Sequence, residues 1–139
     1  MKKKGILHKD LCALIAELGH GDVIVVCDAG FAIPKGTKRI ELAVEKDCPT
    51  VLRILELLRE ELIIERYALA DEIREVNPVM LRKYREVYAG LKVQETFVPH
   101  EKLAGEIAER AKAVIRTGSF QPVSYTHLDV YKRQVSASA

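Results

Sequence analysis

A short apolar run with glycines and ionisable residues on both sides constrains this chain more than any other segment. Residues 23–27 (Val-Ile-Val-Val-Cys) are all apolar, and this length is typical of a buried β-strand. Gly-His-Gly-Asp precedes the run at residues 19–22, and Asp-Ala-Gly follows it at residues 28–30. Glycines allow tight turns and the close approach of a ligand to the backbone. Because ligands of open α/β sheets bind beyond the carboxyl ends of strands, Asp28 stands where a site is expected.

Alternating helical and strand-like patterns predict the fold class. We expect helices over residues 8–18, from 49 through 58, 77–89 and 99–111, and strands over residues 22–28, 39–43, 62–69, 93–98 and 113–115. Strands that alternate with helices of this length are typical of a layered α/β domain with parallel strands. We therefore predict a single three-layer α/β domain with a mostly parallel sheet flanked by helices.

Bulk composition excludes several classes of protein. A chain of 139 residues is one domain, and its net charge of +2 argues against a partner such as nucleic acid. No apolar stretch approaches the roughly 20 residues of a membrane span, and the N-terminus has no signal-peptide core. Cys12, Cys27 and Cys48 are odd in number and lie in mostly apolar surroundings. They indicate reduced core residues of a cytoplasmic protein.

Motifs for metals, phosphates and covalent catalysis are missing from the sequence. The histidines and cysteines show no CxxC, HxxxH or HExxH spacing. There is no GxxxxGK[ST] phosphate loop, no GxGxxG before a helix and no GxSxG nucleophile elbow. We therefore expect neither a metal nor a cofactor.

Three polar residues are candidates for a site, and each has a simpler interpretation. His20 is either a solvated turn residue or a proton donor, because the negative end of the preceding helix favours imidazolium. Asp28 is either a turn carboxylate or an acceptor for a ligand hydroxyl group. His100, next to Pro99, is either a solvated first-turn residue or part of the site. We expect His20 and Asp28 to share one crevice, which would suit proton transfer on a polar ligand.

A series of short motifs stands in order along residues 1–118. They read MKKKGIL at 1–7, LGHGD at 18–22, DAG at 28–30, IP at 33–34, KRIELA at 38–43, NP at 77–78, PHE at 99–101 and AVIRTG at 113–118. Together they resemble the D-ribose pyranase family, the ribose branch of the ribose/fucose mutarotase proteins. The DAG motif followed by Ile-Pro is similar to the ribose branch and not to the fucose branch.

The resemblance implies a cytoplasmic isomerase that interconverts the β-pyranose and β-furanose forms of D-ribose without a cofactor. It implies that His20 is the proton donor and that Asp28 and His100 contact the sugar. It also implies a homo-oligomer, a pentameric ring or a decamer of two rings, with sites near subunit boundaries. Two alternatives stay open: an L-fucose mutarotase, and a sugar-binding module that has lost catalysis.

The C-terminal segment departs from the family pattern. Pro122 matches, but Val-Ser-Tyr at 123–125 replaces a sugar-contacting Tyr-Ala-Asn segment. Residues 124–134 are typical of the non-native read-through at the ends of some assembled metagenomic sequences. We therefore divide the chain into a pyranase-like domain, residues 1–118, and an atypical tail, residues 119–139, that is not native to the family. We expect residues 123–139 not to form the apolar closing strand, because they are polar where a buried strand needs one apolar face.

Overall fold

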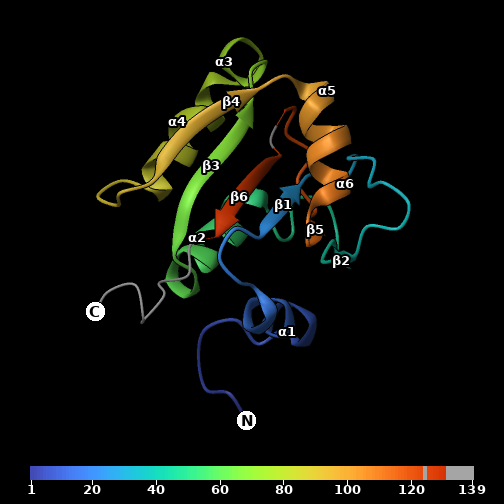
Figure 1. Ribbon diagram of the computed structural model, residues 1–139, viewed down its shortest axis with the longest axis vertical. Coiled ribbons are helices and arrows are strands. Elements are labelled where there is room, and N and C mark those ends of the chain that lie inside the picture. The colour runs from blue at the N-terminus through green and yellow to red at the C-terminus, as the bar shows by residue number, and fades with distance from the viewer. Residues whose placement is uncertain (124, 131–139) are drawn as a thin grey trace.

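A computed structural model describes residues 1–123 and 125–130 and shows one six-stranded sheet in the order β2-β5-β1-β6-β3-β4 (Figure 1). The strands are β1 Val23–Cys27, β2 Arg39–Glu41, β3 Ile64–Ala70, β4 Gln94–Val98, β5 Ala113–Arg116 and β6 Thr126–Val130. The helices are α1 Lys9–Glu17, α2 Val51–Glu61, α3 Ile73–Val76, α4 Pro78–Val87, α5 His100–Lys102, the π-helical turn η1 Leu103–Ile107 and α6 Ala108–Arg110.

The sheet is mixed, with a single strand against the common direction. β2 pairs with β5, β5 with β1, and β3 with β4, all in parallel register. β6 lies antiparallel between β1 and β3, so these two strands also run in the same direction. The prediction of a mostly parallel α/β sheet is therefore confirmed.

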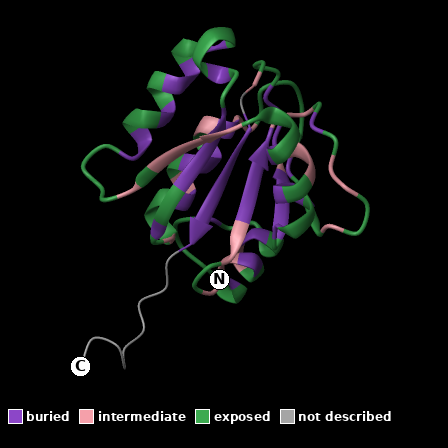
Figure 2. Ribbon diagram, turned by 45° about the horizontal axis from the view of Figure 1, so that its top comes forward, coloured by how far each residue is buried: buried purple, intermediate pink, exposed green. Residues whose placement is uncertain are grey.

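Helices cover both faces of the sheet and form the three predicted layers. One core lies between the sheet and helices α1, α2 and α4, and includes Leu14, Leu55 and Tyr84, all at most 1% exposed. The second core lies under the continuous segment α5-η1-α6 and includes Leu103 and Val114. The central strands β1, β5, β6 and most of β3 are the most buried part of the molecule (Figure 2), as expected for a sheet with both faces covered. The edge strands β2 and β4 are largely exposed or half-buried.

Two of the predicted helix starts are capped by side chains. The Thr50 hydroxyl group accepts a hydrogen bond from the Arg53 amide at 3.0 Å, and α2 follows. The Asn77 side chain accepts from the Met80 amide at 3.3 Å, with Pro78 in the first turn of α4. Both caps supply acceptors for amides that have no partner inside the helix. The short helix α3 was not predicted from the sequence.

The prediction for the C-terminal segment is wrong in its first half. Thr126–Val130 form β6 in the middle of the sheet, and all five residues are buried. Leu128 and Val130 supply the apolar face and pack into the first core. On the polar residues, the Thr126 hydroxyl group donates to the Ala68 carbonyl at 2.6 Å, and Asp129 pairs with Arg66. These partners offset the cost of burying polar groups. The predictions for Ser124 and residues 131–139 lie outside the described residues.

None of the helices within residues 1–123 and 125–130 combines the length and the apolar character that crossing a bilayer requires.

Candidate functional site

The carboxyl ends of three parallel strands meet at one edge of the sheet. Asp28 directly follows β1, His100 begins α5 two residues after β4, and Thr117 follows β5. This is the edge at which ligands bind in open α/β sheets. Asp28 and His100, predicted from the sequence, therefore lie at the same edge.

A pocket of about 330 Å³ opens at this edge. Its walls are the loop after β1 and the loop after β5, and the lining residues are Asp28, Ala29, Gly30, Ser119, Phe120, Gln121 and Pro122. The volume is within the usual range of small-molecule sites. A carboxylate, an amide side chain and exposed backbone suit a small polar ligand better than an apolar one.

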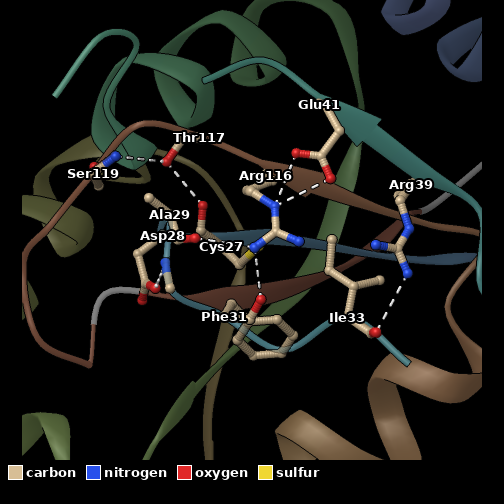
Figure 3. A network of polar contacts seen from close by, with 11 residues as sticks. Cys27, Asp28, Ala29, Phe31, Ile33, Arg39, Glu41, Arg116, Thr117 and Ser119 are labelled. Atoms are coloured by element: carbon tan, nitrogen blue, oxygen red, sulfur yellow. Dashed lines mark hydrogen bonds and ion pairs between the residues drawn. The ribbon is translucent and has the colours of Figure 1, made fainter. Parts of the chain in front are cut away.

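Hydrogen bonds hold the loop that carries Asp28 in a defined conformation (Figure 3). The Gly30 amide donates to Asp28 Oδ1 at 3.0 Å, which forms a short turn closed by the side chain. The Ala29 amide donates to the Ser119 carbonyl at 2.9 Å and ties this loop to the one after β5. The turn interpretation of Asp28 is thus correct as geometry, and the same carboxylate also lines the pocket.

A row of rings connects His100 to the loop after β1. The His100 ring lies 5.2 Å from the Tyr125 ring, and the Tyr125 ring lies 5.1 Å from that of Phe31. Tyr125 and Phe31 are buried, whereas His100 is exposed. The His100 amide donates to the Glu72 carboxylate at 3.1 Å, which fixes the start of α5. An exposed imidazole on a buried support is available to a ligand.

His20 lies at the other edge of the sheet, so the expectation that it shares a crevice with Asp28 of the same chain is wrong. His20 is exposed and precedes β1, whereas Asp28 follows it. The strand runs straight between them, and six steps of a β-strand from residue 22 to residue 28 span about 20 Å. His20 and Asp28 are close in the sequence, but the extended strand between them places them far apart in space.

The cysteine beneath the pocket is unsuited to nucleophilic chemistry. Cys27 is fully buried at the end of β1. Burial, and then the negative charge of Asp28, raise the pKa of its thiol to about 12. A thiol at neutral pH is a poor nucleophile, so Cys27 contributes packing beneath the loop.

No group of three or more His, Cys, Asp or Glu side chains is arranged to hold a metal ion within residues 1–123 and 125–130.

Sequence reasoning missed several residues of this edge. Ser119, Phe120 and Gln121 line the pocket, and Tyr125 supports His100. One signal in the sequence could have indicated these residues. They follow the predicted strand 113–115, and the carboxyl end of that strand lies at the same edge of the sheet as Asp28. Arg116, whose side chain contacts the loop after β1, was noted only as part of a motif.

Fold and pocket together define the class of this protein: an α/β domain with a small polar pocket at the carboxyl ends of its parallel strands. The model of the RbsD / FucU transport protein family matches residues 1–129. The chain belongs to this family. The match includes β6 up to Asp129.

Two D-ribose pyranases are similar to most of this chain. A D-ribose pyranase of Geobacillus kaustophilus is 45% identical over 88% of this chain and 88% of its own. D-ribose pyranase 2 of Rubrobacter xylanophilus is 39% identical over 88% of this chain and 78% of its own.

Solved structures share the fold. RbsD of Bacillus subtilis, complexed with D-ribose, superposes with a TM-score of 0.87 at 32% identity and covers 96% of this chain and 100% of its own. A fucose mutarotase of Streptococcus pneumoniae, in complex with L-fucose, has a TM-score of 0.77 at 19% identity over 92% and 95% of the two chains. At that identity the second likeness concerns the fold alone.

Proposed function

We propose that this chain is an intramolecular isomerase that interconverts the β-pyranose and β-furanose forms of D-ribose. The observation that carries the proposal is the pocket at the carboxyl edge, where Asp28 lines the wall and His100 stands at the end of the ring row. A second support is sequence similarity, because relatives that are 39% and 45% identical to this chain are named D-ribose pyranase.

The reaction requires only proton transfers. Ring opening needs a proton delivered to the ring oxygen and a proton removed from the anomeric hydroxyl group, which leaves the aldehyde form. Closure through the hydroxyl group on C4 instead of C5 then gives the furanose, and the proton transfers run in reverse. General acid–base catalysis of this kind contributes about 10²–10⁴-fold. No electrons are exchanged, so the chemistry calls for no redox cofactor.

Asp28 and His100 hold the sugar in this proposal. A carboxylate accepts hydrogen bonds from sugar hydroxyl groups, and an imidazole both donates and accepts. Asp28 Oδ1 is already oriented by the Gly30 amide. His100 is oriented by the Tyr125 ring. Preorganised groups of this kind reduce the entropy lost on binding.

His20 acts as the proton donor from a neighbouring copy of the chain. Within one chain it lies at the opposite edge of the sheet from Asp28, so it reaches a pocket only across a subunit boundary. Contacts between opposite edges of successive copies are heterologous, and such contacts form a ring when the rotation between copies closes. A pentameric ring, or a decamer of two rings, therefore places each His20 at the pocket of the next subunit.

The three cysteines are consistent with a reducing compartment, and we propose the cytoplasm. Cys12, Cys27 and Cys48 are all free thiols. The expectation of a core residue is correct for Cys27 and wrong for Cys48, which is exposed. An exposed free thiol is better preserved in a reducing environment.

Exchange NMR tests the proposal. Saturation transfer between the ring forms of D-ribose, and separately of L-fucose, is measured with and without the protein. Acceleration for ribose and not for fucose is the expected result. Acceleration for fucose alone would identify a fucose mutarotase. Ribose binding without acceleration would identify a sugar-binding module.

A further inference from the structure

The Arg116 side chain spans the carboxyl ends of β2, β5 and β1. Its Nε donates to both carboxylate oxygens of Glu41, at 3.1 and 2.9 Å. Its Nη1 donates to the carbonyl of Ala29 at 3.0 Å and to that of Phe31 at 2.8 Å (Figure 3). Planar guanidinium geometry suits several simultaneous acceptors, and an ammonium group cannot reproduce it.

One peptide group links Arg116 to Asp28. The carbonyl of Ala29 accepts from Arg116, and the amide in the same peptide unit, that of Gly30, donates to Asp28 Oδ1. A peptide unit is planar, so fixing its carbonyl also fixes the direction of its N–H. A charged donor on the carbonyl also polarises the N–H and strengthens the bond that it donates.

We propose that Arg116 is a positioning residue that sets the Asp28 carboxylate through the Ala29–Gly30 peptide, with Glu41 holding the guanidinium in place. This inference rests on the proposed function. Arg116 is not among the lining residues of the pocket. Its hydrogen bonds to described residues reach one lining residue, Ala29, and its side chain is only 19% exposed. Its effect on ribose is therefore exerted through the loop and not by direct contact.

Substitution of Arg116 by methionine removes the donors and keeps an unbranched stem. Arg116→Met is expected to raise KM for ribose about tenfold, the value for losing a charge-assisted hydrogen bond, with a smaller change in kcat. In an Asp28→Asn background the same substitution should have little further effect, because the two residues act as one unit. Glu41→Gln, which leaves both carbonyl contacts possible, should shift KM in the same direction and by less.

Arg85 offers a matched control. It forms an equivalent two-bond ion pair with Glu95, at 2.9 and 2.8 Å, on α4 and β4 away from the pocket. Arg85→Met should leave KM unchanged. Equal effects of the two substitutions on KM would mean that Arg116 is merely structural, and so would additive effects of Arg116→Met and Asp28→Asn.

Hydrogen–deuterium exchange of a peptide covering residues 28–33 separates this inference from the proposed function. Arg116→Met should speed exchange there, whereas Arg85→Met should not. If Arg116→Met leaves the hydrogen–deuterium exchange of residues 28–33 unchanged, the positioning role is overturned, even if the wild-type protein accelerates the interconversion of ribose ring forms. If the wild-type protein does not act on ribose, the proposed function is overturned. Faster hydrogen–deuterium exchange in Arg116→Met would even then support the link between Arg116 and the Asp28 loop. If Arg116→Met does not fold, Glu41→Gln serves for the same comparison.

Discussion

Single residues at the carboxyl edge divide into exposed groups, which a ligand could reach, and close-packed groups, which hold the loops. His100 is exposed, with its ring against Tyr125. Gly118 is buried under the loop that follows β2. Substitution of an exposed group should change binding, whereas substitution of a close-packed one should change stability.

His100→Ala should weaken ribose binding and leave the melting temperature nearly unchanged. The exposed imidazole contributes few contacts to the core, so its loss removes about one hydrogen bond to the sugar, a two- to tenfold rise in the dissociation constant. Titration calorimetry with ribose measures the change. Lys102→Ala is the control, because Lys102 is exposed on the same short helix. A large loss of melting temperature with unchanged affinity would contradict the assignment.

Gly118→Ala should destabilise the protein because no space exists for a methyl group. A Cβ at this position would lie 2.4 Å from the Glu45 carbonyl oxygen and 2.9 Å from the Cys48 amide. These are backbone atoms, and forcing them apart costs about 1–3 kcal/mol in the free energy of unfolding. Urea denaturation provides the measurement. Gly105→Ala, where nothing lies within 4 Å, should have a much smaller effect, and equal losses would disprove the steric argument.

Secondary-structure elements with regular patterns were predicted correctly, and those that depend on partners were not. Apolar periodicity located the five strands before residue 118, and Asn77-Pro78 located the start of α4. β6 was missed because His127 and Asp129 are polar. Asp129 is compensated by Arg66, far away in the sequence, and His127 Nε2 lies 3.3 Å from Asp129 Oδ1. Such a partner cannot be predicted from the residues around β6 alone.

The site was predicted in part for a similar reason. Asp28 and His100 could be named as candidates from the sequence, because the end of an apolar strand and the Pro-His start of a helix are local signals, and their roles stay predictions. The placement of His20 required the direction of β1 relative to the pocket. Arg116 contacts the loop after β1 from another strand of the sheet. Such relations follow from the topology and not from spacing along the chain.

The buried histidine of β6 should make stability depend on pH. Burial, the largest cause, and the positive charges of Arg66 and Arg110 lower the pKa of His127 below its ordinary value, although Asp129 opposes them. Its Nδ1 is buried without a hydrogen-bond partner among the described residues. The unfolded chain therefore takes up this proton first as pH falls below about 6.5, and the contribution of neutral His127 to stability is lost progressively below that pH.

Urea denaturation at pH 7.5 and pH 5 measures this dependence. The wild-type protein should lose stability on acidification, and His127→Gln should lose distinctly less because it has no group to titrate there. Equal losses in the two proteins would show that His127 does not contribute.

At the scale of the whole molecule, the two edges of the sheet hold different parts of the proposed chemistry. Asp28 lies at one edge and His20 at the other. In the proposed function, an activity that requires both residues depends on assembly, and each subunit contributes to its own pocket and to that of a neighbour.

Mixing of two inactive variants tests this arrangement. His20→Ala and Asp28→Ala, which removes the whole carboxylate, should each abolish accelerated ribose exchange as pure proteins. After the two are denatured together and refolded as a mixture, about one quarter of the sites of a heterologous ring should combine an intact His20 with an intact Asp28. Exchange NMR should then show activity returning to that fraction. Light scattering confirms that the mixture has assembled. Assembled but inactive mixtures would show that the two residues do not meet across subunits.

The position of β6 also bears on how the chain reaches its folded state. β2, β5 and β1 form one group of strands, β3 and β4 form another, and only β6 joins the two groups within the sheet. Because synthesis proceeds from the N-terminus, both groups leave the ribosome before the strand that unites them. Until then β1 and β3 each lack a hydrogen-bonded neighbour on one side, and such unpaired strands pair readily with other chains. Folding through such distant pairings is slow, so we expect the nascent chain to be most prone to pairing with other chains before β6 is inserted.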